Sequence, residues 1–76
     1  MLTLDAIKRG QCARVVDVLG DDAVAVRLME MGLVEGEEVE LIGYAPLGDP
    51  IEFRVRGYCL SLRAGEARRV QVERVP

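Results

Sequence analysis

A chain of 76 residues can build one small hydrophobic core, so its length excludes a large active-site cleft and predicts one domain over residues 1–76. Half of the residues are hydrophobic but only 4% are aromatic, which excludes a disordered chain and predicts an aliphatic core. The net charge of −3 argues against a nucleic-acid partner. No apolar run approaches the ~20 residues that span a bilayer, and no secretion leader is visible, so we expect a cytoplasmic protein without direct membrane insertion.

The first segment predicts a helical turn followed by a strand. Thr3 or Asp5 can begin a single turn, and Gly10 can end it. Residues 12–18 are rich in β-branched side chains, which favour a strand. The apolar residues of this strand change from one face to the other after Val15, so we expect a bulge or burial on both faces.

An amphipathic helix is predicted over residues 22–31. Three of its apolar residues recur at i, i+4 and i+7 and share one face: Val24, Leu28 and Met31. Asp21 or Asp22 can cap its N-terminus, because an aspartate oxygen accepts a backbone N–H of the first turn. Gly32 can end the helix in the left-handed conformation, with Leu33 folded back on the last turn in a Schellman motif.

A half-buried strand and an ordered loop are predicted next. Residues 38–41 alternate glutamate with apolar side chains, and Gly43 interrupts the pattern. Residues 45–50 cannot lie inside a sheet, because their two prolines lack the N–H that a ladder requires. Leu47 in this loop either fills the core or is presented to a partner. The general tendency of leucine to be buried favours the core.

A β-hairpin is predicted over residues 51–62. The dipeptide Arg56-Gly57 fits a two-residue hairpin turn. This turn predicts three apolar pairs on one face: Val55 with Tyr58, Phe53 with Leu60, and Ile51 with Leu62. The same register sets Cys59 opposite Arg54 on the polar face. A short turn, 3₁₀ in character, is expected at residues 64–67, followed by a last strand at 69–73.

The chain contains no recognisable catalytic or metal-binding pattern. It has no histidine, and its hydroxyl side chains besides tyrosine are Thr3 and Ser61. Cys12 and Cys59 form no CxxC pair, so we expect two reduced thiols. A disulfide between them is possible only if the fold brings their Cα atoms close together. The glutamates of residues 35–40 alternate along a strand instead of converging on a cation. The sequence predicts a protein that is not an enzyme, with no catalytic residue, cofactor or metal ligand.

Charge is unevenly distributed along the chain. Residues 1–50 carry four basic and ten acidic side chains, whereas residues 51–76 carry six arginines and three glutamates. A solvated surface accounts for this pattern, and so does docking on a partner of complementary potential. The arginines would also suit a nucleic-acid-binding protein, but the acidic total and the few aromatic residues argue against that class.

The predicted elements favour a mainly β fold. We expect a small SH3-like barrel of about five antiparallel strands, with one α-helix (22–31) and short helical turns. A barrel removes most exposed strand edges, and the helix would cover one open end through its apolar face.

Several fragments of the chain together resemble the FeoA family of bacterial ferrous-iron uptake. Their order and spacing carry the resemblance: Gly10, residues 27–33 (Arg-Leu-Met-Glu-Met-Gly-Leu), Gly36, residues 45–51, Gly57-Tyr58, residues 60–63, residues 66–67 and residues 70–72. The chain departs from the family pattern at Glu35, where proline is usual before the second glycine, and this bears on the stiffness of that turn. The domain is also similar to the C-terminal module of DtxR-type repressors, although no helix-turn-helix precedes it here.

The resemblance implies an SH3-like fold and a cytosolic accessory role in ferrous iron uptake, beside the FeoB membrane transporter and its GTPase domain. It associates the chain with transition metals, yet the residues offer no recognisable iron site, so we expect contact with the cytosolic part of FeoB. The alternatives to this role are a stand-alone adaptor, a weakly self-associating module or a repressor-type nucleic-acid-binding domain.

Two segments are the candidate partner-binding residues. The first is a preformed loop, Leu47, Gly48, Asp49 and Pro50, and the second is the exposed helix flank with Arg27 and Glu30. Structural roles are the alternatives for both segments. Arg27 can pair with a nearby carboxylate, and Gly48-Asp49 can make the turn.

Overall fold

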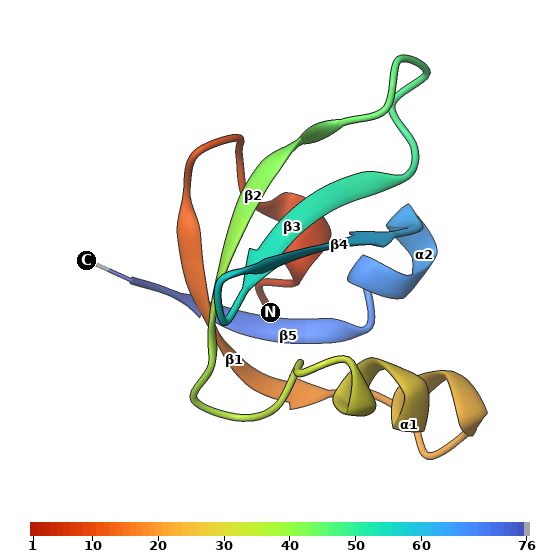
Figure 1. The fold of residues 1–76 in the computed structure, drawn as a ribbon. Helices are drawn as coiled ribbons and strands as arrows, with labels where there is room; N and C mark the ends of the chain where they lie inside the picture. Colours follow the sequence, from red (N-terminus) through yellow and green to blue (C-terminus); the bar gives the residue numbers. More distant parts are fainter. Residues whose placement is uncertain (76) are drawn as a thin grey trace.

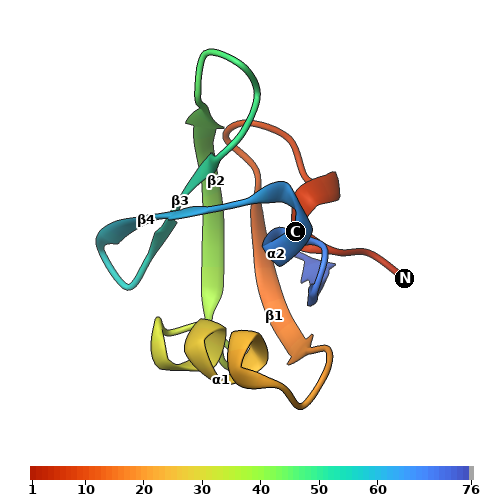
Figure 2. The same ribbon diagram turned by 90° about the vertical axis from the view of Figure 1, so that its right-hand side faces the viewer.

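The computed structural model describes residues 1–75 as a five-stranded antiparallel sheet with two helices and one 3₁₀ turn. The elements in chain order are η1 (Leu4–Ala6), β1 (Cys12–Val18), α1 (Ala23–Glu30), β2 (Glu38–Tyr44), β3 (Ile51–Val55), β4 (Tyr58–Leu62), α2 (Ala64–Ala67) and β5 (Val70–Arg74). The strand order is β4-β3-β2-β1-β5. The sheet is strongly twisted, with α1 at one end of the molecule and the β2–β3 loop projecting at the other (Figures 1 and 2). The predicted mainly β fold with five antiparallel strands and one main helix is confirmed.

The core is aliphatic around a single phenylalanine. Leu28 of α1, Phe53 of β3 and Leu62 of β4 are all buried, and each strand adds further apolar side chains. No polar or charged side chain among residues 1–75 is buried. Burial of apolar surface is therefore the main source of stability, as the composition predicts.

The limits of α1 follow from its capping residues. The Asp22 carboxylate accepts a hydrogen bond from the Ala25 N–H at 3.2 Å. Gly32 has a φ of +104°, and the N–H of Leu33 donates to the carbonyl of Leu28 at 3.2 Å. That bond is the signature of the Schellman motif, and it brings Leu33 into the core. Both predicted helix signals are confirmed.

The buried face of α1 is centred slightly differently from the predicted one. Leu28 is fully buried, whereas Val24 and Met31 are half-buried against the core. Ala25 is also fully buried, although the spacing pattern did not include it. A small side chain at this position allows the helix to lie close to the sheet.

Two bulges explain the imperfect alternation of β1 and β2. The register between β1 and β5 shifts between Val15 and Asp17, so a bulge is the alternative that the fold adopts. The register between β2 and β3 shifts between Leu41 and Gly43, and β2 continues to Tyr44. The expectation that Gly43 interrupts the strand was wrong, because a bulge accommodates the glycine within the ladder.

The β3–β4 hairpin has the predicted register. Val55 pairs with Tyr58, Phe53 with Leu60, and Ile51 with Leu62. The turn residues Arg56 and Gly57 have φ values of 53° and 83°, as a type I′ turn requires.

The two short helical segments differ in detail from the prediction. Residues 64–67 form one α-helical turn, α2, and not a 3₁₀ turn. The first turn, η1, follows Thr3 as predicted but ends at Ala6, well before Gly10. The last strand begins and ends one residue later than the predicted range 69–73.

Candidate partner-binding surface

Leu47 is the most exposed apolar side chain described, at the tip of the β2–β3 loop. It is 97% exposed, so the expectation that it fills the core was wrong. The loop is narrow at its base, because the N–H of Ala45 donates to the carbonyl of Pro50 at 3.0 Å. The N–H of Gly48 then donates to the carbonyl of Ala45 at 2.7 Å and closes a tight turn around Leu47. This turn points away from a core that is already filled (Figure 1).

Asp49 fixes the far side of the same loop to α2. Its Oδ1 accepts a hydrogen bond from the N–H of Ala64 at 2.9 Å, and its Oδ2 lies 3.7 Å from Nη1 of Arg63. Gly48 makes the turn with a φ of +91°. Both residues therefore have the structural role that the sequence left open as an alternative. Capping of α2 by Asp49 was not predicted, because the two segments are distant in the chain.

Arg27 and Glu30 lie on the outer side of α1 with different surroundings. Arg27 forms an ion pair with Oε2 of Glu66, and Oε1 of Glu66 accepts the N–H of Arg63 at 2.9 Å. Arg27 therefore has the nearby carboxylate partner that was considered for it. Glu30 is exposed, and no cation of residues 1–75 lies within 4.0 Å of its carboxylate.

The six predicted residues form two clusters, not one patch. Residues 47–50 lie at the end of the molecule opposite to α1 in both views (Figures 1 and 2). The short helix α2 connects the two clusters, because Asp49 caps its first residue and its Glu66 pairs with Arg27. A partner that contacts both clusters would extend along the side of the molecule that carries α2.

A tyrosine and an arginine beside the loop were missed by sequence reasoning. Tyr44 is the last residue of β2, at the base of the loop, and is 42% exposed. The guanidinium of Arg9 lies over its ring, 5.9 Å from the centroid, which is a cation–π contact. An aromatic residue next to a proline-rich loop is the signal that would have identified this pair. Together with Leu47 these residues give the loop end an apolar and cationic character.

Most charges on the sheet are paired across strands. Seven of the ten basic side chains form ion pairs within the described residues. On the outer face, Arg54 pairs with Glu40 at 3.3 Å and Arg56 with Glu37 at 2.7 Å. Arginines from the second half of the sequence thus neutralise glutamates from the first half. This pairing lowers the net positive charge of the surface that these arginines form.

Two of these pairs shift pKa values. Hydrogen bonds from Arg56 lower the pKa of Glu37, and the same contact raises the pKa of Arg56. Hydrogen bonds from Arg69, with that from the Ala25 N–H, lower the pKa of Asp22 to about 2. Both carboxylates are therefore charged at neutral pH and serve to hold segments together.

The two cysteines are exposed, free and well separated. The ladders set Cys59 opposite Arg54, Arg54 opposite Glu40, and Glu40 opposite Cys12. Three strand spacings of ~4.8 Å separate the two Cα atoms by roughly 14 Å, beyond the ~7 Å limit of a disulfide. No intramolecular bridge can form in this fold.

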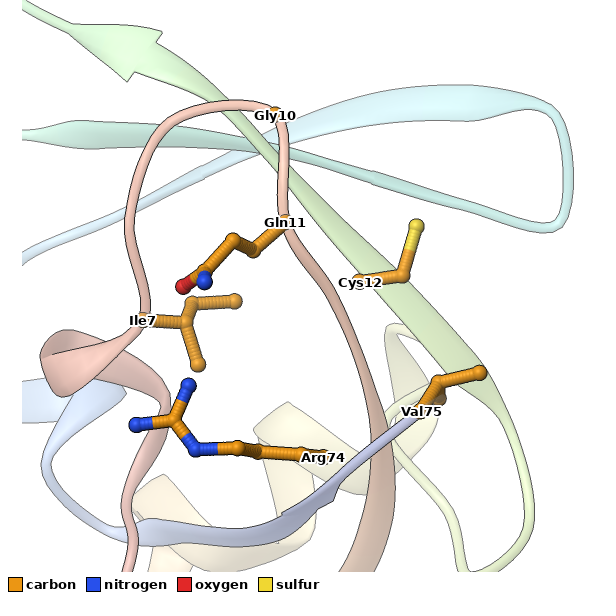
Figure 3. Close-up of a pocket in the computed structure, with 6 residues that line it drawn as sticks. All are labelled: Ile7, Gly10, Gln11, Cys12, Arg74 and Val75. Atoms are coloured by element: carbon orange, nitrogen blue, oxygen red, sulfur yellow. The ribbon is translucent and has the colours of Figure 1, made fainter.

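A shallow pocket of about 290 Å³ opens between the η1–β1 loop and the end of β5. Gln11 and Arg74 direct their side chains toward Ile7, whereas the Cys12 sulfur points away from them (Figure 3). Oε1 of Gln11 already accepts the Lys8 N–H at 2.7 Å. None of the six predicted partner-binding residues lines the pocket. It assembles no pair of nucleophile and base.

Two further properties bear on the class of protein. No group of three or more Cys, Asp or Glu side chains in the described part of the chain could hold a metal ion. No helix within residues 1–75 has the length and apolar character needed to cross a membrane.

Comparison with known proteins identifies the family. The FeoA domain model matches residues 2–74. A fusion of Fe(2+) transport protein A with the Fe(2+) transporter FeoB from Porphyromonas gingivalis is 35% identical over 72 residues, covering 95% of this chain. The chain spans only 8% of that relative's length.

Solved structures agree with this result. The FeoA protein from Chlorobium tepidum shares 39% identity with a TM-score of 0.90, over 99% of this chain and 71% of that one. FeoA from Stenotrophomonas maltophilia, an SH3 domain protein solved with zinc, shares 36% identity with a TM-score of 0.85, over 96% and 91% of the two chains. The SH3-like fold predicted from the sequence is thereby confirmed. This chain belongs to the FeoA family, which is related to ferrous iron transport.

Proposed function

We propose that this protein is one FeoA-type domain that acts as a non-catalytic, cytoplasmic accessory of ferrous iron uptake by contacting the cytosolic, GTPase-containing part of FeoB. The observation that carries the proposal is the relative in which an FeoA domain and FeoB share one polypeptide. Fusion of two domains raises their effective concentration, which favours pairs that work in contact. The many paired basic side chains support a protein partner over nucleic acid.

The β2–β3 loop is the part of the surface that best suits this contact. Leu47 is presented by a closed turn, so little conformational entropy is lost when a partner covers it. Asp49 holds the loop against α2, and Pro50 restricts its backbone further. Arg27 and Glu30 provide a second, polar contact at the other end of α2. Binding that favours one conformation of the transporter would shift its activity without chemistry in this domain.

Binding to the isolated cytosolic part of FeoB from the same organism tests the proposal. We expect binding by isothermal titration calorimetry, and we expect Leu47→Ser to weaken it about tenfold or more, since a buried apolar anchor dominates small interfaces. Val26→Ser compares the two proposed contacts, because Val26 is exposed on α1 one helical turn from Glu30 and away from the loop, so a loss as large as that of Leu47→Ser would assign the main contact to α1. Absence of binding by the unsubstituted chain contradicts the proposal. Unchanged binding by Leu47→Ser contradicts the role of the loop.

A GTPase assay on the same complex then measures the functional effect. We expect the rate of GTP hydrolysis by FeoB to change when this protein is added, and Leu47→Ser to restore the rate of FeoB alone. Sedimentation of this protein by itself distinguishes the alternative of a weakly self-associating module. A dimer that is lost on addition of FeoB is compatible with the proposal, whereas a dimer that excludes FeoB contradicts it.

A further inference from the structure

The strand β4 is an edge of the sheet without a partner on its outer side. It lies at one end of the strand order, and β5 lies at the other. The N-terminal segment covers the middle of β5, because Thr3 bridges to Gln71 and the carbonyl of Leu2 accepts the Val72 N–H at 2.9 Å. Within residues 1–75, no segment pairs with β4 on the side away from β3. The fold protects one edge and leaves the other open.

The hairpin register determines which backbone groups of β4 face outward. The two-residue turn at 56–57 makes Val55 and Tyr58 a hydrogen-bonded pair. Because such pairs alternate along an antiparallel ladder, Cys59 and Ser61 direct their N–H and C=O groups away from β3. These groups make no backbone hydrogen bond elsewhere in the described chain. They form a free row of donors and acceptors.

The composition of β4 does not protect this edge. Its sequence is Tyr-Cys-Leu-Ser-Leu, without charge or proline, and among residues 1–75 β3 is the only strand that pairs with it. Proteins usually block an exposed edge with lysine, proline or a bulge, and β4 has none of these. The side chains of Cys59 and Ser61 are exposed, so an incoming strand would meet no steric obstacle from them. The strand therefore suits β-strand addition.

The charges beside β4 indicate what kind of strand it accepts. Arg56 precedes the strand and Arg63 follows it, with side chains 52% and 69% exposed. Arg56 already holds Glu37 at 2.7 Å, whereas Arg63 lies 3.7 Å from Asp49 and is the more available cation. A second copy of this chain fits poorly, since residues 56–63 contain two arginines and no carboxylate, so a second β4 would offer Arg63 no acidic partner.

We propose that β4 binds an extended segment of a partner protein as a sixth strand, and that this segment has an uncharged, alternating centre and an acidic residue beside Arg63. The backbone groups of Cys59 and Ser61 supply the hydrogen bonds, and Arg63 favours a partner segment with an acidic residue beside it. The inference does not rest on the proposed function, because it concerns another element and any partner with such a segment.

A synthetic peptide, Asp-Val-Thr-Val-Thr-Val-Asp, tests the proposal by NMR on the full ¹⁵N-labelled chain. At millimolar peptide we expect the largest amide shifts at Cys59 and Ser61, together with slower hydrogen exchange of these two amides. Two further peptides carry N-methyl groups, one on its valines and the other on its threonines. The peptide whose methylated N–H groups would face β4 should bind about tenfold more weakly than the unmethylated peptide, because it loses those hydrogen bonds. Equal binding by all three peptides, or largest shifts at α1 or residues 45–50, would overturn the proposal.

The charge preference and the edge itself are tested separately. A lysine-ended version of the peptide should bind several-fold more weakly, and Arg63→Gln should remove this difference. Ser61→Pro deletes one outward N–H while leaving the β3 ladder bonds in place, and should weaken binding about tenfold. If Ser61→Pro does not fold, the N-methylated peptides decide the question alone. A dimer of the unsubstituted chain that protects Cys59 and Ser61 would identify a second copy as occupant and overturn the choice of partner.

Discussion

The carboxylate of Asp49 accepts a hydrogen bond from the backbone N–H of Ala64 at 2.9 Å, although the two residues are 15 positions apart. Arg63, the residue at the cap position of α2, has no acceptor in its side chain, so the cap comes from another segment. The β2–β3 loop and α2 therefore hold each other in position. This contact is what gives the loop that carries Leu47 a fixed base.

Replacing this cap should destabilise the protein and release the loop. We expect Asp49→Ala to lower the free energy of unfolding by about 1 kcal/mol, the usual loss on removal of a helix cap. Asp49→Asn should recover most of it, because an amide oxygen can still accept the Ala64 N–H. Urea unfolding measures both variants. Glu52→Ala is the control, since Glu52 is exposed and unpaired within residues 1–75. If Glu52→Ala lowered the free energy of unfolding as much as Asp49→Ala does, the result would argue against the cap.

Gly32 combines a left-handed backbone with a close neighbour. A Cβ at this position would lie 2.7 Å from the Tyr58 hydroxyl, which donates to the carbonyl of Met31. Gly36 has a similar φ of +93° but open space around it, so Gly36→Ala should cost only the backbone term of about 1–2 kcal/mol. Gly32→Ala should lower the free energy of unfolding by more than Gly36→Ala does, and thermal unfolding measures both losses. In a Tyr58→Phe background the two alanine substitutions should lower the free energy of unfolding equally. A difference that persists in this background would show that the Tyr58 hydroxyl is not responsible.

Leu28 connects α1 to the core. We expect Leu28→Ala to lower the free energy of unfolding by ~2–5 kcal/mol, which is a large fraction of what a domain of this size possesses. Val26→Ala, on the exposed side of the same helix, should change it by less than ~0.5 kcal/mol. Circular dichroism during urea titration gives both values. Equal effects of the two substitutions would mean that α1 does not pack through Leu28.

Asp22 makes stability depend on pH in the acidic range. The pKa of Asp22 in the folded protein is about 2, below its ordinary value of 3.8, so the folded state binds the proton less tightly than the unfolded state. Its contribution is fully present above 3.8 and is lost as the pH falls through about 2. The melting temperature of Asp22→Asn should therefore lie below that of the unsubstituted protein at neutral pH, and the gap should close near pH 2. Asp21→Asn, which removes no ion pair of the described residues, is the matched control and should change the melting temperature at neutral pH far less than Asp22→Asn.

Local sequence signals predicted most of the fold. Asp22 and Gly32 bound α1 as predicted, because capping and left-handed termination depend on the residue itself. The hairpin register also followed from a local signal, the Arg56-Gly57 turn. These features involve residues close in sequence, so no knowledge of the tertiary structure was needed.

What the sequence did not predict depends on contacts between distant segments. Leu47 was expected in the core, but the hydrogen bonds that close its turn keep it in solvent. The pairing of Arg27 with Glu66 spans 39 positions and could not be read from helix periodicity. In the same way, the cation–π contact between Arg9 and Tyr44 arises only when the η1–β1 loop meets the end of β2.

The single row that contains Cys12, Glu40, Arg54 and Cys59 offers a spectroscopic ruler built from the native residues. Both thiols are exposed and can carry spin labels without any mutation. A label pair at these positions spans four adjacent strands, so its distance distribution would report whether the sheet stays rigid or flattens when another protein associates.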